Sequence, residues 1–184
     1  MTTMKNPTDD MMLGCDLSAP HRWGFAALPE GVEYPYNGDD NPMTLIGQYH
    51  LGEGMLYLFA DLDYFFGDLD AESGALGEWD SSFFRVIYSP ARENLHLHRV
   101  LDEEDEPALP AAAPVGEQDI LPKSYDFSDE ISQDYPGYRV LAQVEEDDDL
   151  QLRFYDCGNL TFLIRPADLR ARRFDNVKCV LYSY

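Results

Sequence analysis

The chain has 184 residues, of which 45% are hydrophobic and 13% aromatic, which is enough apolar material for one domain of ordinary size. Asp and Glu number 35 against 13 Lys and Arg, so the formal net charge is −22, which argues against direct binding to nucleic acid or to an anionic membrane. We therefore expect any macromolecular partner to be a basic protein, while the sequence leaves the oligomeric state open.

Three features bear on the cellular location. The first residues lack the charged and apolar regions of a signal peptide, and no apolar stretch approaches the roughly 20 residues of a membrane span. The cysteines, Cys15, Cys157 and Cys179, have no metal-ligand spacing and leave one over if two pair. We expect a soluble cytoplasmic protein that binds no membrane, no metal and no cofactor.

Residues 1–12 are polar and show no hydrophobic period, so they predict a flexible tail before a single domain over residues 13–184. After a coil rich in Pro, Gly and aromatic residues, "TLIGQYHL" (44–51) predicts the first strand. A glycine turn leads into "MLYLFADLDYFF" (55–66), which is apolar on both faces and therefore predicts a central strand.

An acidic loop follows the second strand. Its Asp68, Asp70 and Glu72 alternate as in a calcium-binding loop, but Ser73 and Trp79 stand where such a loop needs Gly and Glu. We therefore expect a solvated acidic surface there and no specific cation site.

The segments "FFRVIYS" (83–89) and "NLHLHRV" (94–100) predict a strand pair around a turn that contains proline. His96 and His98 then project to the same side, as two ligands of a zinc or iron site would. No third ligand has suitable spacing nearby, so we expect these histidines to be exposed or hydrogen-bonded.

The acidic run and four prolines of residues 101–122 predict an extended Pro/Ala-rich connection between two parts of the chain. The second part predicts a short helix in "FSDEISQDY" (127–135), with Ser128 as its cap, and another in "RPADLRARRF" (165–174), with Pro166 in its first turn. Strands are expected at "YRVLAQVE", "LQLRFY", "NLTFLI" and "VKCVLYSY".

The two parts repeat one another. Both "LIGQYHLGEGMLYLFADLD" and "VLAQVEEDDDLQLRFYDCGNLTFLI" run from an apolar segment through Gln to a glycine turn and an alternating strand. Gln48 corresponds to Gln143 and Gly54 to Gly158, and the second copy carries an extra strand, residues 150–155, before its glycine. The predicted fold is α+β and strand-rich, with duplicated antiparallel β units and few short helices.

The triplet Asp156-Cys157-Gly158 has two interpretations. A thiol beside a carboxylate is a possible nucleophile, whereas Asp-x-Gly between apolar runs is typical of a turn. We favour the turn, in which Asp156 bonds its own backbone, Gly158 takes a positive φ and Cys157 is structural, because no histidine lies in the same element.

At these residues the sequence resembles the YwqG-like bacterial family, domain of unknown function 1963, over residues 21–66 and 138–184. The resemblance is carried by "LPEGVEYP", "PMTLIGQYHL" before "GMLYLFAD", "VLAQVEEDDD", "YDCGNLTFLIRPADL" and "RFDNVKCVLYS", while Tyr155 departs from the Gly usual in the family. It implies an α+β fold of duplicated antiparallel strands and no established catalytic residues. Some relatives lie among toxin and immunity genes, which implies a binding role.

Two classes of function fit the sequence. In the first, an acidic intracellular protein of the immunity or inhibitor type captures a basic partner through its carboxylates. The expected partner-binding residues are Asp68, Asp70, Glu72, Glu145, Glu146, Asp147, Asp148 and Asp149. In the second, a small enzyme or small-ligand binder uses a cleft between the repeats, with Gln48, Gln143 and Asp156 in it. We favour the first class, because the sequence shows no complete catalytic set.

Overall fold

The structure is a computed structural model that describes residues 16–102, 104–116, 119–125 and 127–183. The predicted tail at residues 1–12 lies outside these ranges. The elements, in chain order, are β1 (His21–Arg22), β2 (Ala26–Pro29), β3 (Thr44–Leu51), β4 (Gly54–Ala60), the 3-10 helix η1 (Asp63–Phe66), β5 (Gly77–Glu78), β6 (Phe84–Ser89), β7 (Leu95–His98), β8 (Ala113–Pro114), α2 (Ser128–Asp134), β9 (Arg139–Glu145), β10 (Asn159–Ile164), α3 (Pro166–Ala171) and β11 (Lys178–Tyr182).

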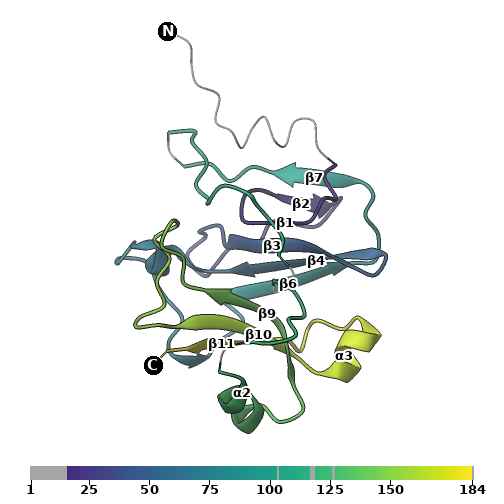
Figure 1. Ribbon diagram of the computed structural model, residues 1–184. Helices are drawn as coiled ribbons and strands as arrows, with labels where there is room; N and C mark the ends of the chain where they lie inside the picture. The colour runs from purple at the N-terminus through teal and green to yellow at the C-terminus, as the bar shows by residue number, and fades with distance from the viewer. Residues whose placement is uncertain (1–15, 103, 117–118, 126, 184) are drawn as a thin grey trace.

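The strands form three antiparallel sheets that are stacked as layers (Figure 1). A five-stranded sheet has the order β6-β4-β3-β1-β8, a four-stranded sheet has the order β5-β11-β10-β9, and β2 pairs with β7. In Figure 1, β2 and β7 lie above the five-stranded sheet, the four-stranded sheet lies below it, and α2 lies lowest. The predicted strand-rich α+β fold, with antiparallel sheets and few helices, is confirmed.

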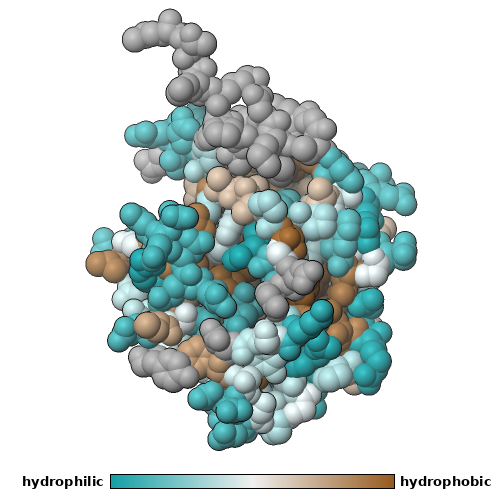
Figure 2. Space-filling view, viewed as in Figure 1, coloured by the Kyte–Doolittle hydropathy of each residue, from teal (hydrophilic) through white to brown (hydrophobic). Residues whose placement is uncertain are grey.

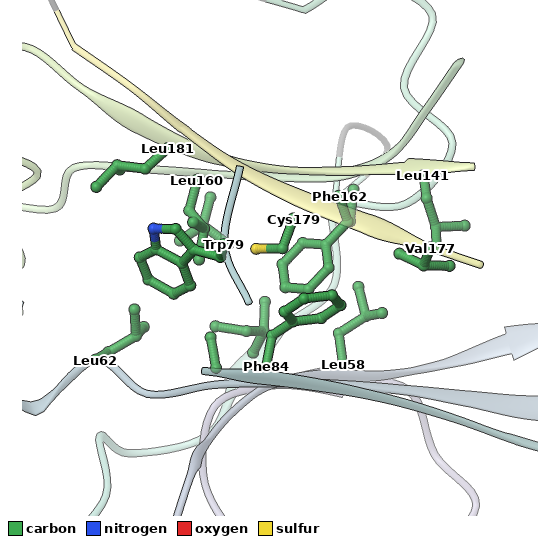
Figure 3. Packing of buried hydrophobic residues seen from close by; sticks show 14 of the residues in the cluster. Leu58, Leu62, Trp79, Phe84, Leu141, Leu160, Phe162, Val177, Cys179 and Leu181 are labelled. Carbon is green, nitrogen blue, oxygen red and sulfur yellow. The ribbon is translucent and has the colours of Figure 1, made fainter. Parts of the chain in front are cut away.

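The main core lies between the two larger sheets. Alternate side chains of β4, beginning with Leu56, face this core, and the others, beginning with Met55, face the β2–β7 layer. Phe84 of β6 and Phe162 of β10 meet edge to face across the core, with their ring centroids 6.1 Å apart (Figure 3). The predicted central strand is apolar on both faces because each face packs against another layer.

The hairpins β3–β4 and β9–β10 have the same pairing register. Gln48 pairs with Tyr57, which stands three residues after Gly54. Gln143 pairs with Thr161, which stands three residues after Gly158. In both hairpins a bulge falls two residues before the glutamine, and the next strand, β6 or β11, pairs from the residue directly after the glycine.

The bulged residues also have similar partners outside their hairpins. The carbonyl of Ile46, at the first bulge, accepts a hydrogen bond from Trp23 N–H at 3.3 Å. The carbonyl of Leu141, at the second bulge, accepts one from Leu121 N–H at 2.6 Å. We call the strands β3, β4 and β6 the first hairpin unit and β9, β10 and β11 the second hairpin unit.

Two predicted strand features are wrong. β6 pairs with β4 and β7 pairs with β2, so residues 83–100 form no hairpin. Residues 150–155 form no strand, and only an isolated bridge joins Asp147 to Leu152. The alternation that predicted a strand here buries Leu152 and Phe154 in the core without any neighbouring strand.

Two smaller corrections concern the second part of the chain. α2 begins at Ser128, with Phe127 at the N-cap position and no side-chain cap, so the predicted Ser128 cap is wrong. The Pro/Ala-rich connection also takes part in the five-stranded sheet, because its β8 pairs with β1.

Candidate functional site

A polar cavity of about 420 Å³ lies where β1 of the five-stranded sheet approaches the edge strand β9 of the four-stranded sheet. Its lining comes from β1, from the end of the connection and the residues after it, and from β9 and the loop that follows. The described lining residues are Arg22, Asp119, Pro122, Ser124, Tyr125, Gln143, Glu145, Glu146 and Asp147. This volume falls within the range of about 300–1,000 Å³ that small-ligand sites occupy.

Gln143 is fixed on the cavity wall by a buried polar network. Its Nε2 donates to Asn159 Oδ1 and to Thr161 Oγ1, both at 3.0 Å. Thr161 Oγ1 donates to the same Asn159 oxygen at 2.7 Å, and both partners are buried. Because buried polar groups are costly to leave unpaired, this part of the wall is held rigidly.

The opposite part of the lining contains an ion pair. Arg22 Nη1 donates to Asp119 Oδ1 at 3.0 Å, and the two side chains are 25% and 13% exposed. Asp119 Oδ2 also accepts a hydrogen bond from Gly116 N–H. The pair is therefore partly withdrawn from water and adds little net charge to the cavity.

Two carboxylates of the lining order the loop that follows β9. Glu146 Oε1 accepts hydrogen bonds from the backbone N–H groups of Phe154, at 2.9 Å, and of Gly158, at 3.3 Å. Asp147 Oδ1 accepts from two N–H groups of the next turn, at 2.9 and 3.1 Å. One oxygen of each carboxylate is thus used within the protein, and the other is left for a partner.

The other acids of this run are exposed. Asp148 forms a surface ion pair with Arg153 at 2.6 Å, which contributes little to stability. Over the described ranges of the chain, the carboxylates of Glu145 and Asp149 make no hydrogen bond or ion pair. Glu145 follows Gln143 by two residues on β9, so both side chains lie on the cavity side of that strand.

The other acidic segment lies against the loop after β9. Arg153 N–H donates to Phe65 O at 3.0 Å, and the Phe65 ring contacts the rings of Phe154 and Tyr155, with centroid distances of 5.2 and 5.8 Å. Both segments lie at the left of Figure 1. We call the exposed carboxylates of these two loops the acidic end, which consists of Asp68, Asp70, Glu72, Asp148 and Asp149.

Two aspartates at the base of the first acidic segment serve the fold. Asp61 is only 4% exposed and accepts a hydrogen bond from Asn37 Nδ2 at 2.8 Å. Burial raises the pKa of Asp61. Burial, together with the charges of Asp61 and Asp68, raises the pKa of Asp63.

The triplet at residues 156–158 is a structural turn. Cys157 is exposed at φ 55°, and its Sγ lies 4.0 Å from Asp156 Oδ1. The predicted positive φ of Gly158 is wrong, because Cys157 takes the left-handed conformation instead. Gly158 is required for a different reason, since a Cβ there would lie 2.3 Å from Phe154 O and 2.6 Å from Tyr182 O.

The three residues expected in a cleft are dispersed. Gln143 lines the cavity, as described above. Gln48 is buried under the β2–β7 layer, where its Oε1 accepts from Ala27 N–H at 3.0 Å. Asp156 is exposed in its turn, and its backbone exchanges hydrogen bonds with Ser183 Oγ.

The histidines of β7 lie opposite β2, where His96 pairs with Leu28 and His98 with Ala26. The described residues contain no group of three or more His, Cys, Asp or Glu side chains arranged to hold a metal ion. In the same part of the chain, no helix combines the length and the apolar character that a membrane span needs.

Of the described residues that line the cavity, the sequence predicted only Gln143 for a cleft, and it placed Glu145, Glu146 and Asp147 on a partner-binding surface. Arg22 lies in an early strand of two residues, Asp119 lies near the end of the connection, and Ser124 and Tyr125 follow the connection directly. No spacing or motif in the sequence links these residues with Gln143, since only the stacking of the two sheets brings them together.

A search of curated proteins finds no match to the chain. Residues 127–182 match the family described as Domain of unknown function (DUF1963). The matched range contains the second hairpin unit, with Gln143, Asp156 and Gly158. Residues 127–182 are therefore similar to the DUF1963 family, which is the family that the sequence resembles.

Proposed function

We propose that this is a cytoplasmic acidic binding protein that captures a basic protein partner, in the manner of an immunity or inhibitor protein. The net charge of −22 and the contact between the two acidic loops support this function. A concentrated negative surface attracts a cationic partner before contact and speeds association.

The observation that carries the proposal is the hydrogen bond from Arg153 N–H to Phe65 O, which joins two acidic segments far apart in the sequence. Leu69 and Tyr155, which are 75% and 49% exposed, lie in the same loops and offer apolar contact area. Figure 2 shows a largely hydrophilic surface at this side of the molecule, with small hydrophobic patches. An apolar contact inside a charged rim is typical of a protein interface.

The experiment is a kinetic comparison with a partner captured from the native host. Raising the salt concentration to 1 M reduces the Debye length to about 3 Å, so association should slow markedly. A triple variant of the acidic end, D68N/D70N/E72Q, should slow association at low salt by about tenfold, with a smaller effect on dissociation.

The matched control removes three carboxylates outside the acidic end. The variant E30Q/E33Q/E53Q changes the net charge by the same amount at exposed positions. It should reduce the association rate much less than the acidic-end variant does. Equal effects of the two variants would assign the attraction to the general negative field of the protein and not to the acidic end. Kinetics indifferent to salt would mean that the acidity serves solubility alone.

We further propose that the two hairpin units are copies of one ancestral unit, as in the YwqG-like bacterial proteins. The common register, the common bulge position and the similar hydrogen bonds to the bulged carbonyls support this origin. An experimental structure tests it by superposition of β3–β4–β6 on β9–β10–β11. If that superposition fails to bring Gln48 onto Gln143 and Gly54 onto Gly158, the duplication is rejected.

A second candidate function is small-ligand binding, with or without catalysis, in the cavity beside β9. The observation that favours it is the origin of the lining, because the cavity walls come from β1, the connection and the second hairpin unit. Sites between packed units are common positions for ligands.

A further inference from the structure

We infer that the cavity beside β9 binds a small ligand that carries an ammonium group, and that Glu145 is the carboxylate that pairs with it. This inference rests on the second candidate function and is independent of protein capture at the acidic end.

The first argument is the charge of the lining. Among the described residues that line the cavity there are four carboxylates and one guanidinium, so the formal charge of these residues is 1 minus 4, or −3. The guanidinium of Arg22 is already paired with Asp119. Glu145, Glu146 and Asp147 therefore lack a cationic partner within the described lining, and a bound cation would relieve their mutual repulsion.

The second argument is the number of oxygens left to a ligand. Glu146 and Asp147 each use one oxygen to order the loop after β9. Neither carboxylate oxygen of Glu145 accepts a hydrogen bond from a residue that the structure describes. A primary ammonium has three donors and no acceptor, so it matches a site where several carboxylate oxygens converge.

The third argument is shape and rigidity. The cavity of about 420 Å³ has room for a short aliphatic chain as well as for the charged group. Gln143 is locked on one wall by Asn159 and Thr161, and the Arg22–Asp119 pair forms another wall. A preformed polar wall lowers the ordering cost of binding, which favours a small ligand.

The test is calorimetric titration of the full chain with 1,5-diaminopentane at about 0.1 M salt, where the Debye length is about 10 Å. Two probes of equal length serve as controls, namely the neutral 1,5-pentanediol and the dianion glutarate. The diamine should bind saturably with one molecule per chain, and neither control should bind. Absence of saturable diamine binding would overturn the inference.

Variants then locate the site. Glu145→Gln should weaken diamine binding by about tenfold or more, because a charge-assisted hydrogen bond becomes a neutral one. Glu53→Gln removes one exposed carboxylate from the β3–β4 turn and should leave the affinity unchanged. Equal weakening by both variants would assign the binding to the general negative field of the protein and overturn the inference.

A third variant shifts the affinity in the opposite direction. Arg22→Met leaves Asp119 without its cation, so the cavity becomes more negative and the diamine should bind more tightly. Weaker diamine binding by folded Arg22→Met, with a melting transition as the check of folding, would contradict the inference. Glu145→Gln should leave capture of a protein at the acidic end intact, so the two proposals can fail separately.

Discussion

Arg22 and Asp119 form a 3.0 Å ion pair across 97 residues of sequence, at the point where β1 meets the connection to the second hairpin unit. Leu121, two residues after Asp119, donates its N–H to the bulged carbonyl of Leu141. The ion pair therefore fixes the connection to the five-stranded sheet directly beside its attachment to the four-stranded sheet. Its loss should weaken the packing of the two sheets.

We expect Arg22→Met to lower the free energy of unfolding by about 1–3 kcal/mol, because it leaves a partly buried carboxylate unpaired. Denaturant unfolding of Arg22→Met, Asp119→Asn and the double variant measures the coupling. The double variant should lose less stability than the sum of the single variants. Additive losses would show that the pair contributes nothing.

Gln48→Met should cost about 2–4 kcal/mol, because it leaves buried backbone groups without partners. The side chain accepts from Ala27 N–H at 3.0 Å and donates to the carbonyls of Leu17, at 2.9 Å, and Ala19, at 2.8 Å. Thermal and denaturant unfolding measure the loss. The exposed Gln133→Met in α2 is the control and should change stability by less than about 0.5 kcal/mol.

Gly158→Ala should destabilise the fold by more than about 2 kcal/mol, since the new Cβ would overlap two backbone carbonyls, those of Phe154 and Tyr182. Neither carbonyl can move away without disturbing the loop or β11. Gly38→Ala is the matched control, because a Cβ there meets no atom within 4 Å. A loss at Gly158 no larger than at Gly38 would disprove the close approach.

Cys157→Gly should stabilise the protein by about 0.5–1 kcal/mol, because the left-handed backbone conformation of Cys157, at φ 55°, is strained for any residue with a Cβ atom. Cys157→Ala keeps the strain and should leave stability nearly unchanged.

Thiol alkylation measures the exposure of the two cysteines. The buried Cys179, whose pKa is raised by burial, should react only on unfolding, whereas Cys157 is exposed.

Stability should fall as the pH decreases through about 6.5, the ordinary pKa of histidine. Burial lowers the pKa of His21, whose Nε2 is buried and has no hydrogen-bond partner among the described residues. The unfolded chain therefore takes up a proton at a higher pH than the folded chain, so acidification favours unfolding. His21→Gln should flatten this part of the stability profile.

The sequence correctly predicted those strands and helices that a pattern of a few neighbouring residues specifies. β10 begins and ends at the expected residues, and α3 begins at Pro166, because alternation and helix-start chemistry act within a few positions. Alternation of apolar and polar residues indicates which side chains are buried, but it does not identify the strand that pairs with the segment. Residues 150–155 therefore imitate a strand, and the partners of β6 and β7 were assigned wrongly.

The same limit applies to the cavity. Gln143 was expected in a cleft because it stands in a strand with a recognisable pattern, whereas Glu145 of the same strand was expected on the partner-binding surface. Arg22 carries no such pattern, and its position beside Asp119 depends on how the two larger sheets stack.

The shared core between the two larger sheets also sets the order in which the chain matures during translation. β3, β4 and β6 leave the ribosome well before β11, and β2 and β7 are available early to cover their outer face. The inner face, with Leu56 and Leu58, is fully covered only after the whole second hairpin unit has emerged, of which β11 with Cys179 and Leu181 comes last. The nascent protein therefore has an incompletely covered core until β11 has emerged, and chaperones that bind exposed apolar surface should recognise it up to that point.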